Sequence, residues 1–233
     1  SMATNLQAGL PPIVDETNPQ IAVGTEFELR DGRKYRYARA GAVALVVGNV
    51  VQAAAETTAH QNLAFAAAAL AATSVVTTTT VTVTANQYAG GYVTVSVTPD
   101  LGASYRIKSH AAATAAVVTL VLEEGIRTAW TTATRADLVA NPYAAVIVTP
   151  TTPTGVIVGV AANDVAISGY GWIQTFGPCN VVADAAGVAV GSQVSASNAT
   201  AGNVETFVSG QQIVGRAMSG IAASENGMIF LEV

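Results

Sequence analysis

Long runs of alternating β-branched residues most restrict the fold of this 233-residue chain. The clearest run, SVVTTTTVTVTA at residues 74–85, consists mainly of valine and threonine, whose branched side chains disfavour helices and suit strands. Alanine, valine and threonine together fill 105 of the 233 positions. We therefore predict a mainly β protein of short-stranded barrel or sandwich modules, with at most one or two short helices.

Shorter stretches carry the same two-residue period. Residues 25–37 predict a hairpin, because apolar residues alternate on both sides of Asp31-Gly32, a pair typical of a type I′ turn. Residues 53–72 leave helix and strand open, since alanine favours helix whereas the Leu63/Phe65 alternation favours strand. Further strands are predicted within 42–51, 92–97, 104–110, 117–124, 170–177 and the C-terminal part, the last strand entered through an Asn226-Gly227 turn.

The predicted domain organisation has four parts. An extended N-terminal arm covers 1–24, a β-rich domain 25–148, a Pro/Thr-rich linker or edge loop 149–164, and a small C-terminal barrel 165–233. A faint similarity between AGAVALVVGNVVQ (40–52) and AAGVAVGSQVSAS (185–197) suggests an alternative. In that alternative, residues 25–52 pack with 165–233, and 53–150 form an inserted lobe.

Charge is scarce and unevenly distributed. Charged residues make up 11% of the chain, and none occurs between Glu56 and Asp100. Such stretches suggest surfaces covered by partners, because a monomer normally stays soluble through mixed surface charge. The longest apolar run, Leu63–Ala72, is too short to span a bilayer, so no membrane partner is expected. The net charge of −5 gives no general attraction to nucleic acid.

No familiar catalytic pattern occurs in the sequence. The common phosphate-binding, zinc, serine-nucleophile and calcium motifs are missing, and His60 and His110 stand apart from any carboxylate cluster. The single cysteine, Cys179, is most simply a buried apolar residue. We expect no enzymatic activity, cofactor or metal.

One charged feature stands out. Five of the ten basic residues lie within ten positions, interleaved with Tyr35 and Tyr37: Arg30, Arg33, Lys34, Arg36 and Arg39. Three interpretations are open: a hairpin paired with its own Glu26, Glu28 and Asp31, a contact with an acidic protein surface, or single-stranded nucleic acid stacked on the tyrosines, which is the least favoured.

Four segments of the chain carry a resemblance to a known class of proteins. They are GTEFELRDGRKYRYARAGA; AHQNLAFAAAALAATSVVTTTTVTVTANQYAGGYVTVSV followed by SYRIKSH; ANPYAAVIVTPTTPTGVIVGVA; and GYGWIQTFGPCNVVAD. In this order they resemble structural proteins of tailed bacteriophages, and more narrowly capsid decoration proteins, also called cement or auxiliary head proteins.

The resemblance implies a non-enzymatic virion protein, made in the host cytoplasm, that binds the outer surface of the assembled capsid and bridges capsid subunits. Its partners would be the major capsid protein and itself, as a homotrimer. Candidate capsid contacts are Arg30, Arg33, Lys34, Arg36, Arg39, Pro11, Pro12 and Ile13, and candidate core anchors of the C-terminal barrel are Trp172, Phe176 and Phe230. The alternative is a tail, fibre or capsid-displayed module that binds host surface or glycans through exposed aromatic residues such as Trp130 or Trp172.

Overall fold

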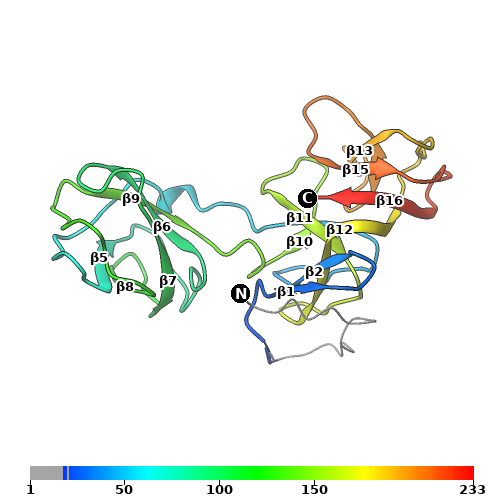
Figure 1. Ribbon diagram of the computed structural model, residues 1–233. Coiled ribbons are helices and arrows are strands. Elements are labelled where there is room, and N and C mark those ends of the chain that lie inside the picture. The colour runs from blue at the N-terminus through cyan, green and yellow to red at the C-terminus, as the bar shows by residue number, and fades with distance from the viewer. Residues whose placement is uncertain (1–17, 20) are drawn as a thin grey trace. The chain divides into compact units, whose positions relative to one another are not determined.

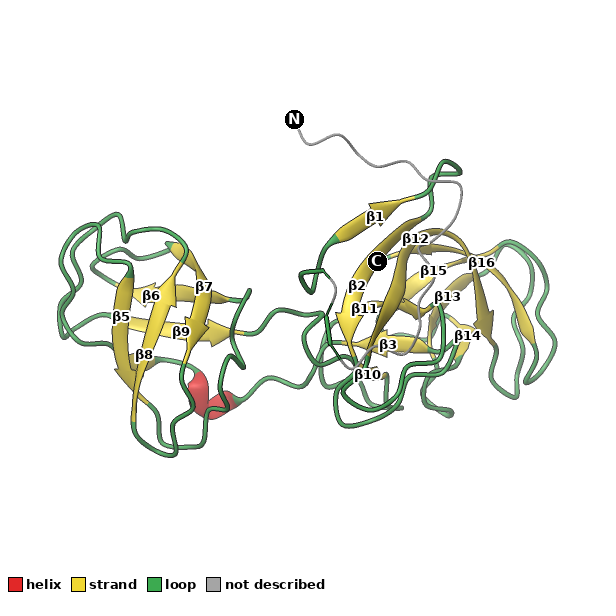
Figure 2. Ribbon diagram, turned by 90° about the horizontal axis from the view of Figure 1, so that it is seen from below, coloured by secondary structure: helices red, strands yellow, loops and turns green. Residues whose placement is uncertain are grey.

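The regular secondary structure of the protein is almost entirely β (Figures 1 and 2). The computed structural model describes residues 18–19 and 21–233, of which 44% lie in strands or isolated β-bridges and 1% are helical. The prediction of a mainly β, barrel-like protein is confirmed. Most of the predicted arm, 1–24, lies outside the described residues, including Pro11, Pro12 and Ile13.

The chain divides into two compact units. Unit 1 combines the chain up to Ala55 with Pro142–Val233, and unit 2 is Glu56–Asn141. The Pro/Thr-rich stretch 149–164 therefore does not link domains, because both of its ends belong to unit 1. Residues 34–39 pair with 170–176 in one sheet, which agrees with the alternative in which 25–52 pack with 165–233.

Unit 2 contains a six-stranded antiparallel sheet in the order β4-β9-β6-β7-β8-β5. A bridge between Phe65 and Thr77 joins the two ends of this order, so the sheet nearly closes. One face of each strand fills the core, as the buried Val93 and Val95 do in β6. The strands are β4 (Leu63–Ala64), β5 (Ser74–Thr78), β6 (Tyr92–Val97), β7 (Ser104–His110), β8 (Val117–Leu122) and β9 (Arg135–Val139).

One prediction for unit 2 needs correction, and one open alternative is resolved. The strand over 74–85 ends at Thr78, because the buried Thr79 donates its hydroxyl to the Val81 carbonyl and the chain turns away; Val83 then forms only an isolated bridge. Within 53–72 there is no α-helix, only a 3₁₀ turn at Thr58–His60 followed by β4.

Unit 1 contains a ten-stranded sheet in which β10-β3-β11-β12-β16-β15-β13-β14 run side by side and β1-β2 attach to β12. All these pairings are antiparallel. The strands are β1 (Glu26–Glu28), β2 (Lys34–Arg39), β3 (Val50–Gln52), β10 (Ile147–Val148), β11 (Ile157–Ala161), β12 (Tyr170–Val182), β13 (Gln193–Ala196), β14 (Val204–Thr206), β15 (Ile213–Ala217) and β16 (Asn226–Glu232).

The sheet of unit 1 consists of two halves with the same strand arrangement, an internal duplication. The strand order of the first half is β2, the start of β12, β11, β3 and β10. The strand order of the second half is the end of β12, β16, β15, β13 and β14. Residues 34–52 correspond to 177–195, and residues 157–173 to 213–229. The correspondence holds residue by residue, since Gly159 opposite Val51 matches Gly215 opposite Val194, with a bulge beside each pair.

The two halves also share one core pattern. Every buried residue in the core of the first half corresponds to a buried residue in the core of the second, and eight of the seventeen positions in 157–173 are identical to 213–229. The matched core pairs are Ala38/Val181, Ala40/Ala183, Leu45/Val188, Val51/Val194, Val146/Val204, Val158/Val214, Ala161/Ala217, Val165/Ile221 and Ile173/Ile229.

The duplication explains where unit 2 enters the chain. In the second half, β13 and β14 form a hairpin joined by Ser197–Asn203. Their counterparts in the first half, β3 and β10, also pair, with Gln52 opposite Ile147, yet all of unit 2 lies between them. Unit 2 is thus inserted at the tip of a hairpin.

Two predicted turns differ in detail. Only Gly32 of the Asp31-Gly32 pair has a positive φ (85°), so the hairpin closes through a three-residue loop with glycine in the left-handed position, not through a type I′ turn. Asn226-Gly227 is not a turn but the start of β16, where a Cβ on Gly227 would lie 2.5 Å from the Ile221 side chain.

Candidate functional site

The basic hairpin of β1 and β2 is the candidate site that sequence analysis singled out. In the β1–β2 register, Glu26 lies opposite Arg36 and Glu28 opposite Lys34. Opposite charges therefore face each other across the hairpin, an arrangement that stabilises neighbouring strands.

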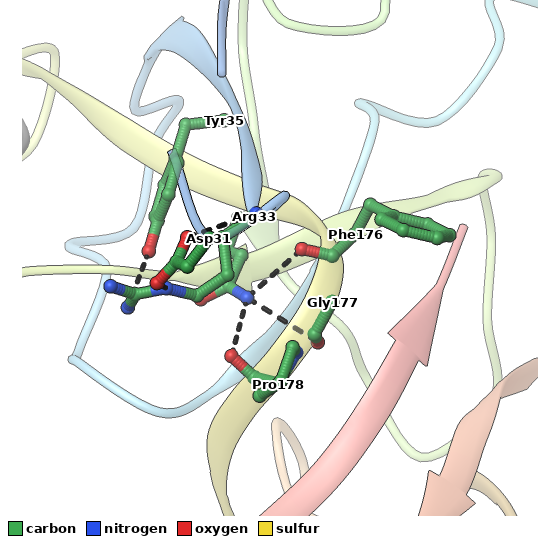
Figure 3. Close-up of polar contacts among 7 residues, drawn as sticks. Asp31, Arg33, Tyr35, Phe176, Gly177 and Pro178 are labelled. Carbon is green, nitrogen blue, oxygen red and sulfur yellow. Dashed lines mark hydrogen bonds and ion pairs between the residues drawn. The ribbon is translucent and has the colours of Figure 1, made fainter. Parts of the chain in front are cut away.

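At the hairpin tip, Arg33 is held by its neighbours (Figure 3). Its Nε donates to Asp31 Oδ2 at 2.7 Å, and its Nη1 donates to Tyr35 Oη at 3.0 Å. Hydrogen bonds from the Arg33 backbone N–H and side chain lower the pKa of Asp31 below its ordinary value. This carboxylate therefore stays ionised at neutral pH and keeps its ion pair with Arg33.

Two further basic side chains are occupied by the chain's own oxygens. Arg36 forms an ion pair with Glu26 at 2.6 Å and donates to the Gly24 carbonyl at 2.9 Å, while Arg39 donates to the Ser168 carbonyl at 3.3 Å. Among the described residues, Arg30 and Lys34 have no ion pair. The hairpin is thus largely self-paired, and these two cations are the ones left for a partner.

The tyrosines of the hairpin cannot serve as a stacking platform. Tyr35 and Tyr37 are 2% and 3% exposed, buried in an aromatic cluster with Leu29 and Trp172. Binding of single-stranded nucleic acid by base stacking needs exposed rings. The burial of both rings therefore argues against single-stranded nucleic acid stacked on these tyrosines.

Beside the hairpin, a buried glutamine fixes the point where β12 passes from the first half to the second. Gln174 Nε2 donates to the carbonyls of Phe176 (3.1 Å), Gly177 (3.4 Å) and Pro178 (2.8 Å). These three acceptor residues are labelled in Figure 3. Gly177 has a φ of +90°, a conformation that other residues adopt only with strain. The bend directs the Phe176 ring outward, 6.0 Å from Lys34 Nζ.

The three predicted core anchors are placed differently from one another. Trp172 is buried, 2% exposed, but Phe176 is 37% exposed and Phe230 is half-buried. The reason is the two-residue period of β16, in which Ile229 and Leu231 point into the core and Phe230 points out. The two phenylalanines instead contact each other on the surface, with ring centroids 5.3 Å apart.

Trp130 is also buried, at 2% exposure, in unit 2. Its Nε1 donates to Asp100 Oδ2 at 3.0 Å, and the same oxygen accepts from Tyr105 Oη at 2.5 Å. The aspartate therefore satisfies two buried aromatic polar groups, a structural role that the sequence did not reveal.

Both histidines lie in unit 2 and contact the same tyrosine. His60 Nδ1 is 2.5 Å from Tyr88 Oη, and His110 Nε2 accepts the backbone N–H of Tyr88 at 3.0 Å. Because Nε2 of His110 is an acceptor, its proton is on Nδ1, which donates to the Ala111 carbonyl. Burial lowers the pKa of His60 below its ordinary value of 6.5. Burial thus favours the neutral form of the His60 ring.

Acidification is expected to destabilise unit 2. Because the folded-state pKa of His60 lies below its unfolded value, the unfolded chain binds more protons, and stability is lost as the pH falls below about 6.5. The unfolding midpoint of unit 2, followed by Trp130 fluorescence, should fall by several degrees between about pH 7.5 and pH 5. A His60→Gln variant, which retains an acceptor for Tyr88, should shift less; an equal shift would show that His60 is not responsible.

Cys179 is buried beneath the sheet of the second half. Burial raises the pKa of its thiol to about 12, so the reactive thiolate is not populated at neutral pH. Within residues 18–19 and 21–233, no group of three or more His, Cys, Asp or Glu side chains is placed to hold a metal ion.

Comparison with known proteins gives no relative for this chain. No protein-family model, curated protein or solved structure matches it. In the part of the chain that the structure describes, no helix is long and apolar enough to cross a membrane.

Proposed function

We propose that this chain is a non-enzymatic bacteriophage structural protein that binds the outside of the assembled capsid and stabilises it by bridging capsid subunits. Its partners are the major capsid protein and further copies of itself, arranged as a trimer on the virion surface. Stabilisation follows from mass action, because a protein that binds the closed shell and not free subunits favours the closed shell.

The observation that carries the proposal is an apolar tip on the first half of unit 1. Val43, Val46, Val47 and Ile167 are 49–61% exposed on the two loops that meet at the Leu45–Val165 bridge. The same two loops in the second half meet at the Val188–Ile221 bridge. There the corresponding residues are Ala186, Ala189, Val190 and Ala223.

The second half indicates whether these loops need large side chains in order to fold. It has alanine at three of the four positions and still forms the same loops, so the fold does not require the larger side chains of the apolar tip. Exposed branched residues grouped in this way are typical of a protein contact surface. Arg30 and Lys34, which form no ion pair with the described residues, supply a polar contact for an acidic partner surface.

The glycan-binding alternative is not supported by the tryptophans. Exposed tryptophans or tyrosines would have favoured it, but Trp130 and Trp172 are both 2% exposed. We therefore do not propose it.

Replacing the apolar tip with the residues of the second half tests the proposal. The variant Val43→Ala/Val46→Ala/Ile167→Ala should unfold at nearly the wild-type temperature, because the second half folds with these alanines. In purified virions, quantitative mass spectrometry should find the wild-type chain in a fixed ratio to the major capsid protein and the variant reduced at least about tenfold, the effect of about 1.4 kcal/mol of lost binding energy.

The matched control is Val190→Ala, which removes an even more exposed valine from the second half. This variant should remain on the virion. Absence of the wild-type chain from virions, or a handful of copies per particle, would contradict capsid decoration, and full retention of the triple variant would remove the apolar tip as the contact.

A further inference from the structure

The chain enters unit 2 through a short segment that is anchored by one buried histidine. We call residues 56–62, which include the 3₁₀ turn Thr58–His60, the entry segment. Of its side chains only His60 is buried, with an exposed fraction of 0%. A second tie to the rest of unit 2 is a hydrogen bond from Asn62 N–H to Asp137 Oδ1 at 2.6 Å. The imidazole ring thus takes the place that an apolar anchor would normally fill.

The surroundings of His60 suit only a neutral ring. Its Nδ1 is 2.5 Å from Tyr88 Oη, and the two rings meet edge to face with centroids 5.5 Å apart. Its Nε2 is buried and has no hydrogen-bond partner among the described residues. An imidazolium donates through both nitrogens, so a charged ring would bury one N–H without an acceptor. Because an unpaired buried charge is far more costly than an unpaired neutral group, a protonated ring is favoured to leave this position.

No charged group offsets that cost. No carboxylate of the described residues forms an ion pair with His60. The nearby backbone of Val81 favours the charged ring, but burial outweighs it and lowers the pKa of His60. The titratable side chains around the ring and the entry segment are Tyr88, His110, Glu56 and Asp137.

We propose that the entry segment is an acid-sensitive latch, which protonation of His60 releases while the sheet of unit 2 stays folded. Release is local because the seventeen-residue core of unit 2 contains Tyr88 but not His60. The next element, β4, is only two residues long, so little strand pairing holds the segment from that side. Segments with few buried contacts open at a lower free energy than the whole domain. The unfolding midpoint of unit 2 measures global stability, whereas the latch opens first.

Hydrogen exchange of the full chain at about pH 7.5 and about pH 5, corrected for the intrinsic pH dependence of amide exchange, tests the latch. The amides of His60, Gln61 and Asn62 are hydrogen-bonded in the closed latch. Their protection should fall at least about fivefold in acid, because the released segment takes up one proton. The amides of β6 and β7 should keep their protection.

Four variants assign the response. His60→Gln cannot take up the proton and should show no loss of protection in acid. Tyr88→Phe retains His60 but lacks the hydroxyl, so the entry segment should exchange faster already at neutral pH and faster still in acid. His110→Gln and Asp137→Asn remove the neighbouring titratable groups and should keep the acid-dependent loss.

The NMR titration of the His60 ring in the wild-type protein gives the assignment without a variant, since its midpoint should coincide with that of the loss of protection. Unchanged exchange at 60–62 in acid would overturn the proposal. Equal loss in β6 and β7 would also overturn it, because unit 2 would then unfold as a whole. An acid response that persists in His60→Gln, or disappears in His110→Gln or Asp137→Asn, would show that another group is responsible.

Discussion

Replacing Glu56–Asn141 with a short Gly-Ser linker is expected to leave unit 1 folded. The reason is the duplication: β3 and β10 are the counterpart of the β13–β14 hairpin, which closes with Ser197–Asn203 alone. Gln52 and Ile147 already pair at the base of the insertion, so the two chain ends need only a tight connection. Hairpin tips are sites where a protein tolerates insertion or removal of a segment.

The measurement is thermal unfolding of the shortened protein by circular dichroism, with Trp172 fluorescence as a second probe. A single sharp transition by both probes is the expected result. The complementary fragment 56–141 should also fold, because its core of seventeen buried residues lies wholly within it. A shortened protein without a cooperative transition would show that unit 1 depends on the insertion.

The second prediction compares corresponding residues of the two halves. Trp172→Ala should lower the free energy of unfolding by about 3–5 kcal/mol, the range for large aromatic truncations in a core. Trp172 is 2% exposed and contacts Phe27 and Tyr37, with ring centroids 5.6 and 5.3 Å away. Its counterpart Met228 is 40% exposed, so Met228→Ala should cost about 1 kcal/mol or less.

Denaturant unfolding of both variants at one pH gives the comparison, since the backbone position in the sheet is the same for the two residues. Equal losses would mean that sheet position, not the aromatic cluster, determines the cost. A small loss for Trp172→Ala would contradict its assignment to the core.

Local patterns predicted most strands of this protein but not their extent. The alternation in 92–97 and 104–110 coincides with β6 and β7, because one face of each strand is buried. The period over 74–85 continues past the end of β5, since a hydroxyl-to-backbone bond at Thr79 ends the strand without changing the sequence pattern. Asn226-Gly227 resembles a turn, but its glycine is there to leave room for Ile221.

Long-range organisation was harder to predict. The similarity between 40–52 and 185–197 was genuine but shifted by two residues, since the structure places 40–52 on 183–195. The stronger match of 157–173 with 213–229 is hard to distinguish from chance in a sequence with so many valines, alanines and glycines. For the candidate site, composition identified the basic cluster and left pairing with its own carboxylates as one of three interpretations. Arg36 and Arg33 do form ion pairs with Glu26 and Asp31. The burial of Tyr37 depends on Trp172, far along the chain, so local sequence could not predict it.

The sharing of β12 has a consequence for how unit 1 unfolds. This single strand, Tyr170–Val182, completes the first half with its beginning and the second half with its end. Neither half can therefore detach as an independent domain, because losing one removes a strand from the other. Tandem repeats joined by a linker can melt one at a time, whereas these two must lose order together. What is a duplication in sequence and topology behaves in thermodynamic terms as one cooperative block.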